Sequence, residues 1–165
     1  ERCLVSFGNS SGPVMSPVMY NSHMQIVQSP GYVTIIIEMV HDARIIKISD
    51  ERSAASPALN KWMGDSIGRW EGDTLVIDTI AYEPNASGNG ANVPSSANKH
   101  TVERLTLTAD RLRLRYEITV EDAEFLATPG TLTQQWDHRP DLEFSPASEA
   151  CSDEAAARYK PHVPQ

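Results

Sequence analysis

Residues 111–121 read RLRLRYEITVE, and apolar and polar side chains alternate along the whole stretch. One face carries Leu112, Leu114, Tyr116, Ile118 and Val120, and the other carries Arg113, Arg115, Glu117 and Thr119. A period of two is the spacing of a β-strand. One wet face beside one apolar face is typical of an antiparallel sheet. The stretch therefore predicts an antiparallel strand over residues 111–121.

Other segments have the composition of strands, and turn residues such as Pro, Gly and Asp separate them. These segments cover residues 23–28, 32–40, 43–48, 66–71, 74–82, 100–108 and 132–137. Short helices are expected over Pro57–Met63 and Asp153–Tyr159. About eight strands in consecutive hairpins, with one or two short helices, predict an all-β fold. We expect an antiparallel up-and-down barrel or a curled, lipocalin-like sheet, which can hold one small ligand in its mouth.

The 165 residues suit one β-rich domain that covers residues 1–165. Within it we expect a loop-rich N-terminal arm over residues 1–20 and a C-terminal tail over residues 152–165. Residues 83–99 are rich in Gly, Pro, Asn and Ser, so they predict a long loop that acts as a lid or a floppy connection.

The charge of the chain argues against several classes of partner. Its formal net charge is −8, so phosphate backbones and anionic membrane surfaces should repel it. The longest apolar run, Tyr32–Val40, is interrupted by Glu38 and falls far short of the ~20 residues that span a bilayer. We therefore expect no nucleic-acid partner and no membrane span.

The chain starts at Glu1 without an initiator Met, which indicates a processed or truncated start. Its two cysteines, Cys3 and Cys151, lie near opposite ends. They are interpreted either as a disulfide, which an exported protein would form, or as two buried thiols. A disulfide closing so long a loop would stabilise the fold by about 5 kcal/mol in the chain-entropy view. Neither Cys has a metal-ligand spacing around it, so no metal is expected.

Several motifs together resemble a family of exported bacterial proteins without an assigned activity. The most specific is WMGDS at residues 62–66, continued by GRWEGDTLVIDT at residues 68–79. Further matches are Tyr20-Asn21, QIVQ at residues 25–28, EMVHDARII at residues 38–46, Arg2-Cys3 and Ala150-Cys151. The resemblance implies an exported, β-rich domain with paired cysteines.

The chain also departs from that family in its loops. It has Lys47-Ile48-Ser49-Asp50 where the family tends to have Pro-Leu-Asp-Gly. Asp122-Ala123 replaces an Asp-Pro, and Ser152-Asp153 replaces a His-Glu. These differences leave the ligand preference open.

Candidate catalytic residues lie around one predicted turn. Glu38 and Arg44 are expected to share a strand face, with His41 between them at the turn. A His–carboxylate pair there would suit proton transfer, because His titrates near neutrality. The alternative is a capped turn with a cross-strand ion pair. Asp65 and Tyr116 are the other candidates for a catalytic role.

Candidate ligand-binding residues follow from polar groups in apolar surroundings. Asp78 and Tyr116 each occupy an otherwise apolar strand face, and Glu103 lies on the neighbouring strand, so each faces either a ligand cavity or a polar partner. Further candidates are Tyr20, His23, Arg44, Trp62 and Arg69. The charged residues of the long motif equally suit a structural network.

Three functions remain open from the sequence. The first is a small-ligand-binding barrel outside the cytoplasm, periplasmic or extracellular, which takes a small, partly apolar molecule. The second is a cofactor-free lyase, isomerase or hydrolase that uses His41 with Glu38, Asp65 or Tyr116. The third is a structural subunit of an extracytoplasmic assembly. No phosphate-binding, dinucleotide-binding or zinc-protease signature is present, so no cofactor is expected.

Overall fold

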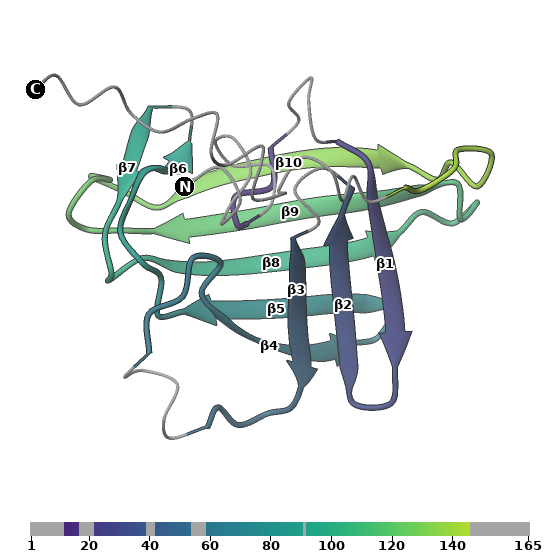
Figure 1. Ribbon diagram of the computed structural model, residues 1–165, viewed down its shortest axis with the longest axis horizontal. Coiled ribbons are helices and arrows are strands. Elements are labelled where there is room, and N and C mark those ends of the chain that lie inside the picture. Colours follow the sequence, from purple (N-terminus) through teal and green to yellow (C-terminus); the bar gives the residue numbers. More distant parts are fainter. Residues whose placement is uncertain (1–11, 17–21, 39–41, 54–58, 91, 146–165) are drawn as a thin grey trace, which may run out of the picture.

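The computed structural model describes residues 12–16, 22–38, 42–53, 59–90 and 92–145, and these ranges contain strands and no helix (Figure 1). The strands are β1 (Met24–Ser29), β2 (Tyr32–Ile37), β3 (Ala43–Ile48), β4 (Asp65–Glu71), β5 (Thr74–Ile80), β6 (Asn85–Gly90), β7 (Val93–Ser95), β8 (His100–Leu107), β9 (Arg113–Glu121) and β10 (Gly130–Asp137). Each strand segment predicted from the sequence overlaps one of β1–β5 or β8–β10, with ends that differ by up to three residues. The prediction of an all-β curled sheet is confirmed.

One sheet holds eight of the strands in the order β1-β2-β3-β4-β5-β8-β9-β10, and β6 pairs with β7 in a separate sheet. Neighbours in the large sheet are antiparallel except for β3 and β4. These two pair in parallel, with Lys47 opposite Ile67 and Ile48 opposite Gly68. A parallel pair needs a crossover connection, which the chain between β3 and β4 supplies. The expectation of hairpins throughout is therefore wrong at this point.

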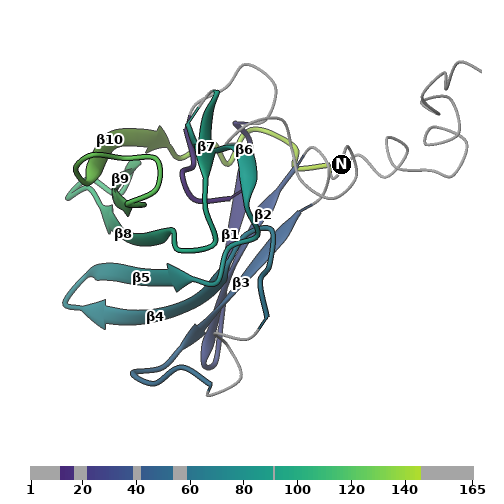
Figure 2. The same ribbon diagram turned by 90° about the vertical axis from the view of Figure 1, so that its left-hand side faces the viewer.

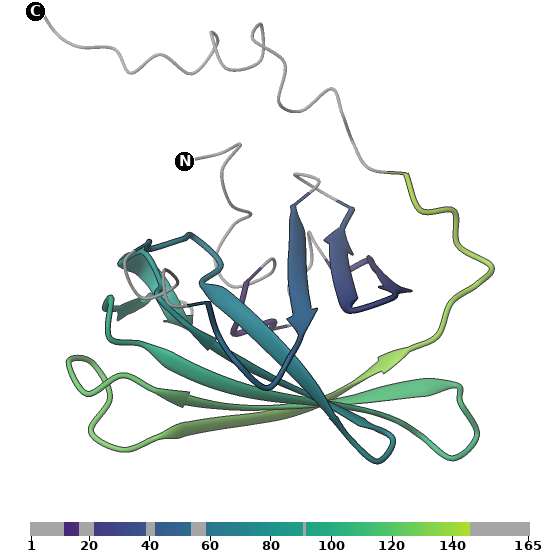
Figure 3. The same cartoon turned by 90° about the horizontal axis from the view of Figure 1, so that it is seen from below.

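The sheet curls so that one part of it covers another. In Figure 1, β1–β3 run across the direction of β4, β5 and β8–β10. Figures 2 and 3 show β1–β3 as a layer of their own, lying over β8–β10. A twisted sheet that folds over itself in this way buries the inner face of its central strands, such as β2, β8 and β9, between the two layers.

The core lies on the inner face, where the alternating patterns of the strands place their apolar residues. In β2 and β9 every second side chain is buried. The buried strand residues of the core are Val33, Ile35, Ile37, Ile46, Leu75, Ile77, Leu105, Tyr116, Ile118 and Val120. Removing one such aliphatic side chain from water stabilises the fold by roughly 1.5–3 kcal/mol.

Two local predictions differ from the structure. Residues 59–63 of the expected Pro57–Met63 helix form a bridge and a turn, because the backbone of Lys61 bonds to Ala81 and Glu83 beyond β5. The expected loop 83–99 contains the β6–β7 hairpin, which Asp122 holds by accepting 2.8 Å hydrogen bonds from Asn89 Nδ2 and the backbone N–H of Ser96. The helix expected over residues 153–159 lies outside the described residues.

Gly64 ends the turn that leads into β4, and we expect it to tolerate no side chain. Its φ is +70°, and a Cβ there would lie 2.5 Å from Thr79 Cγ2 and 2.9 Å from the carbonyl oxygen of Ile80. Gly64→Ala should therefore lower the free energy of unfolding by about 2–3 kcal/mol in urea denaturation. Gly31→Ala is the matched control, because Gly31 has φ +79° but open space around it. This variant should lower the free energy of unfolding by only about 1 kcal/mol. Equal losses in the two variants would contradict the steric argument.

Candidate functional site

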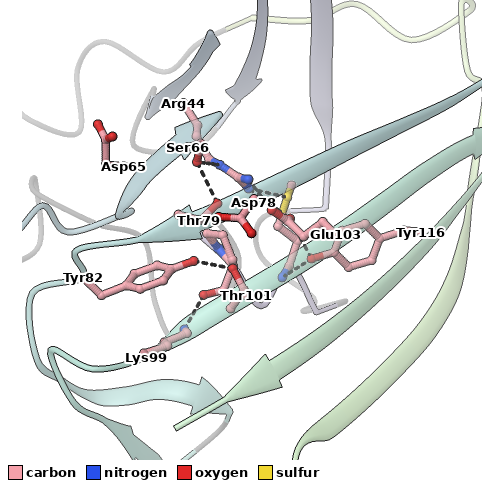
Figure 4. A network of polar contacts seen from close by, with 12 residues as sticks. Arg44, Asp65, Ser66, Asp78, Thr79, Tyr82, Lys99, Thr101, Glu103 and Tyr116 are labelled. Carbon is pink, nitrogen blue, oxygen red and sulfur yellow. Dashed lines mark hydrogen bonds and ion pairs between the residues drawn. The ribbon is translucent and has the colours of Figure 1, made fainter. Parts of the chain in front are cut away.

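Three strands bring three polar side chains to one point of the inner face. Arg44 lies on β3, Glu103 on β8 and Tyr116 on β9, and each is at most 4% exposed. In β8, Thr101, Glu103 and Leu105 point inward by strand alternation, so the carboxylate of Glu103 enters an apolar core. Figure 4 shows the three side chains directed toward one another.

Hydrogen bonds join the three side chains. Arg44 binds Glu103 bidentately: Nη1 donates to Oε1 at 3.0 Å, and Nη2 donates to Oε2. Tyr116 donates its hydroxyl to Glu103 Oε1 at 2.9 Å. Burial lowers the pKa of Arg44, but the adjacent Glu103 carboxylate more than offsets this effect. The pKa of Arg44 therefore lies above its ordinary value. Burial and the same carboxylate raise the pKa of Tyr116. Arg44 and Tyr116 therefore both keep their protons at neutral pH.

Hydroxyl groups extend this set from Arg44. Arg44 Nε donates to Ser66 Oγ at 3.1 Å, and Ser66 Oγ lies 2.9 Å from Thr79 Oγ1. The hydroxyl of Tyr82 lies 2.6 Å from Thr101 Oγ1, and burial raises the pKa of Tyr82. Such a network orients each member, because buried polar groups require partners.

Lys99, just before β8, adds a buried amine. Its Nζ donates to the carbonyl of Pro13 at 2.6 Å and also to the carbonyl of Gly88. It lies 4.5 Å from the centroid of the Tyr82 ring. Burial lowers the pKa of Lys99 to about 8, although the nearby carboxylates of Glu103 and Asp122 oppose the shift.

This lowered pKa makes stability depend on pH. The pKa of Lys99 is about 8 in the folded chain against an ordinary 10.5, so between these values the unfolded chain holds more protons. The free energy of unfolding should therefore rise by on the order of 2 kcal/mol from pH 8 to pH 10. Above pH 10 the raised tyrosine pKa values reverse the trend. Urea denaturation across this range should show a clearly smaller rise in Lys99→Met than in the exposed control Lys47→Met; the same rise in both would refute the assignment.

Part of the interior is filled by a segment that is neither helix nor strand. We call residues 12–16 the strap. Its Val14 and Met15 are 6% and 2% exposed. The backbone N–H of Met15 donates to Tyr116 Oη at 3.3 Å, and Gln134 Nε2 donates to the carbonyl of Met15. Sequence reasoning placed this segment in the N-terminal arm and missed its role; the only signal is an apolar Val-Met pair among serines and prolines.

The predicted catalytic group is spread over the molecule. Tyr116 is in the interior, whereas Glu38 lies 3.1 Å from His23 Nδ1, and Phe144 packs edge-on against the His23 ring. The pairing of Ile35 with Arg44 puts Glu38 on the face opposite Arg44. The expectation that Glu38 and Arg44 share a face is wrong, because the turn changes the parity. His41 and Tyr20 lie outside the described residues.

Asp65 and Asp78 lie on the outer side of the sheet. Arg52 donates to the side chain of Asp78 and lies 3.6 Å from Asp65 Oδ2. His100 Nε2 lies 2.9 Å from Asp78 Oδ2, and its Nδ1 lies 3.1 Å from Glu121. Partial burial lowers the pKa of His100, but the two carboxylates have the larger effect, so the pKa lies above its ordinary value. Figure 4 shows Asp65 away from the interior set.

The remaining candidates also lie away from the interior. Trp62 is exposed in the turn before β4. Arg69 and Arg104 both bind the exposed carboxylate of Glu71, at 2.7 Å and 2.8 Å. Of the predicted site residues, the structure therefore brings together Arg44, Glu103 and Tyr116. It adds Lys99, Gln134 and the strap.

Among the described residues, no cluster of three or more His, Cys, Asp and Glu is placed to hold a metal ion. In the same ranges no helix is long and apolar enough to cross a membrane. No protein-family model matches the sequence, and neither a curated protein nor a solved structure matches the chain.

Proposed function

We propose that this chain binds a small, partly apolar molecule inside the curled sheet, next to Tyr116, Gln134 and Lys99. The observation that carries the proposal is the strap. A segment outside the sheet fills part of the interior, and side chains of the sheet and its loops hold it by hydrogen bonds to its backbone. A ligand with an apolar body and one or two hydrogen-bond acceptors has matching chemistry.

The buried charges support the same proposal. An ion pair with 3% and 0% of its side chains exposed contributes little net stability, because desolvation offsets the attraction. Well-packed apolar residues of similar size often give about the same stability as such a pair. The buried Arg–Glu–Tyr set beside the strap favours a role in orienting a polar group of a ligand.

Trp136 can report on the site, because its ring stacks on Tyr116 with centroids 4.6 Å apart. In the variant Trp62→Phe/Trp70→Phe, which removes the two exposed tryptophans, Trp136 is the only one left. Titrating this variant with small aromatic and aliphatic molecules that carry one carbonyl or carboxyl group should give a saturable change in its fluorescence for at least one of them.

Neighbouring glutamines provide the matched control. Gln134 faces the strap, and Gln135 is exposed on the other face of β10. Gln134→Leu should weaken binding about tenfold, because one hydrogen bond to a buried group is lost. Gln135→Leu should leave affinity unchanged. A panel that gives no saturable signal, or equal effects of the two variants, would exclude the proposed site.

We further propose that the protein works outside the cytoplasm, as the resemblance to an exported family implies. Membership of that family stays a prediction, and Cys3 and Cys151 lie outside the described residues. Thiol counting under denaturing, non-reducing conditions tests the paired cysteines that the resemblance implies, because a Cys3–Cys151 disulfide leaves no reactive thiol. Two reactive thiols would rule out the disulfide.

A further inference from the structure

We propose that the natural ligand is a short, uncharged, apolar peptide, and that the strap occupies its site as an intramolecular competitor. This inference rests on the proposed function and names its ligand class. It follows from how the strap is held, from what surrounds it and from one buried acceptor beside it.

The first argument is that the strap is recognised through its backbone. The carbonyl of Pro13 accepts from Lys99, the N–H of Met15 donates to Tyr116, and the carbonyl of Met15 accepts from Gln134. The three partner side chains come from the segment before β8, from β9 and from β10. These three contacts are made to backbone groups and not to side chains, so a peptide of another sequence in the same backbone conformation would make them too.

The second argument concerns the side chains. Val14 and Met15 are buried in the hydrophobic core, and the Sδ of Met15 lies 3.9 Å from Arg44 Nη1. Arg44 is already neutralised by Glu103. A charged side chain in place of Met15 would lose its hydration without gaining a free counter-charge, so the site favours apolar, uncharged residues.

The third argument is an acceptor beside the strap that no described residue satisfies. Gln134 Oε1 is buried and has no hydrogen-bond partner among the described residues. Its Nε2 already holds the strap. A bound peptide that places an N–H at this oxygen would satisfy it, which the strap does not.

An occupant tethered to its own site masks that site. Tethering gives the strap an effective concentration in the millimolar range or above, so an added peptide competes poorly with it. Loosening the strap should therefore raise the apparent affinity for an added peptide. Val14→Gly/Met15→Gly in the full chain removes the two buried side chains and keeps the backbone.

The test is isothermal titration calorimetry with the acetylated, amidated peptide SGPVMSP, which reproduces residues 11–17. The double variant should bind it at least about tenfold more tightly than the unchanged chain. The peptide with Asp in place of Met should fail to bind. So should the peptide N-methylated at Met, because it lacks the N–H that donates to Tyr116.

If the double variant is unfolded alone, the peptide must restore its β-sheet circular dichroism spectrum. Failure to bind a folded variant, failure to restore an unfolded one, or equal binding of the three peptides would overturn the inference. The Trp136 titration separates this outcome from failure of the proposed function. If small non-peptide molecules change Trp136 fluorescence and the peptide does not, the proposed binding site stands and only the peptide is excluded as its ligand.

Discussion

Arg44→Ala is expected to lower the free energy of unfolding by about 3–5 kcal/mol, because it leaves the Glu103 carboxylate buried without its counter-charge. Glu103 is fully buried, and of its three described hydrogen bonds two come from Arg44. The remaining bond from Tyr116 cannot offset the desolvation of a carboxylate. Urea denaturation at pH 7 measures the loss.

Two controls separate burial from charge. The double variant Arg44→Met/Glu103→Leu removes both charges, so it should recover most of the stability that the single variant loses. Arg69→Ala breaks an ion pair with Glu71 that is exposed on both sides, and its loss should stay below about 1 kcal/mol. Equal losses for Arg44→Ala and Arg69→Ala would show that the interior pair is not desolvated.

Met15→Ala is expected to lower the free energy of unfolding by about 2–4 kcal/mol, through lost burial and the cavity left behind. Met15 is 2% exposed and belongs to the core cluster. The cavity would lie beside Tyr116 and Arg44, where the ligand is proposed to bind. A small apolar molecule that fills it should therefore raise the melting temperature of the variant in proportion to the logarithm of its concentration.

Leu107→Ala is the control for this experiment, because Leu107 is 55% exposed at the end of β8. Leu107→Ala should lower the free energy of unfolding by under about 1 kcal/mol, and small molecules should not change the melting temperature of this variant. A Met15→Ala variant as stable as the unchanged chain would mean that the strap is not packed in the core.

The fold could be predicted to the extent that it follows from local alternation. Residues 113–121 alternate in burial as their sequence does. Residues 100–106 also alternate in burial, but their buried face carries Thr101, Glu103 and Leu105, so the sequence there shows no apolar alternation. The parallel contact of β3 with β4 could not be predicted, because it depends on where a long connection returns to the sheet. The β6–β7 hairpin was missed because NASGNG carries no hydrophobic period.

The site could be predicted only in part, for a physical reason visible on β5. The rule that a polar group on an apolar face points inward holds for Tyr116 but not for Asp78. On β5 both faces bury apolar residues: Val76 is on the outer face, paired with Arg69 and Arg104, and is fully buried. These two arginines flank it on the neighbouring strands β4 and β8. Alternation then cannot tell inside from outside.

Apart from the Val14-Met15 pair, neither the strap nor Lys99 had a local signal, because their burial depends on contacts far along the chain. Met15 and its partner Gln134 are separated by 119 residues, and Lys99 and Pro13 by 86. A lysine is rarely buried without a partner, and here its described hydrogen-bond partners are backbone carbonyls that no sequence pattern marks.

The most direct test of the interior site is nuclear magnetic resonance of the full chain labelled with ¹³C at the methionine methyl groups. The chain has five methionines, and Met15→Leu assigns the signal of interest. On titration with a molecule or peptide that binds, the account predicts a saturable change in the Met15 signal, larger than that of Met63 in the turn before β4. A ligand that binds while the Met15 signal stays unchanged would contradict it.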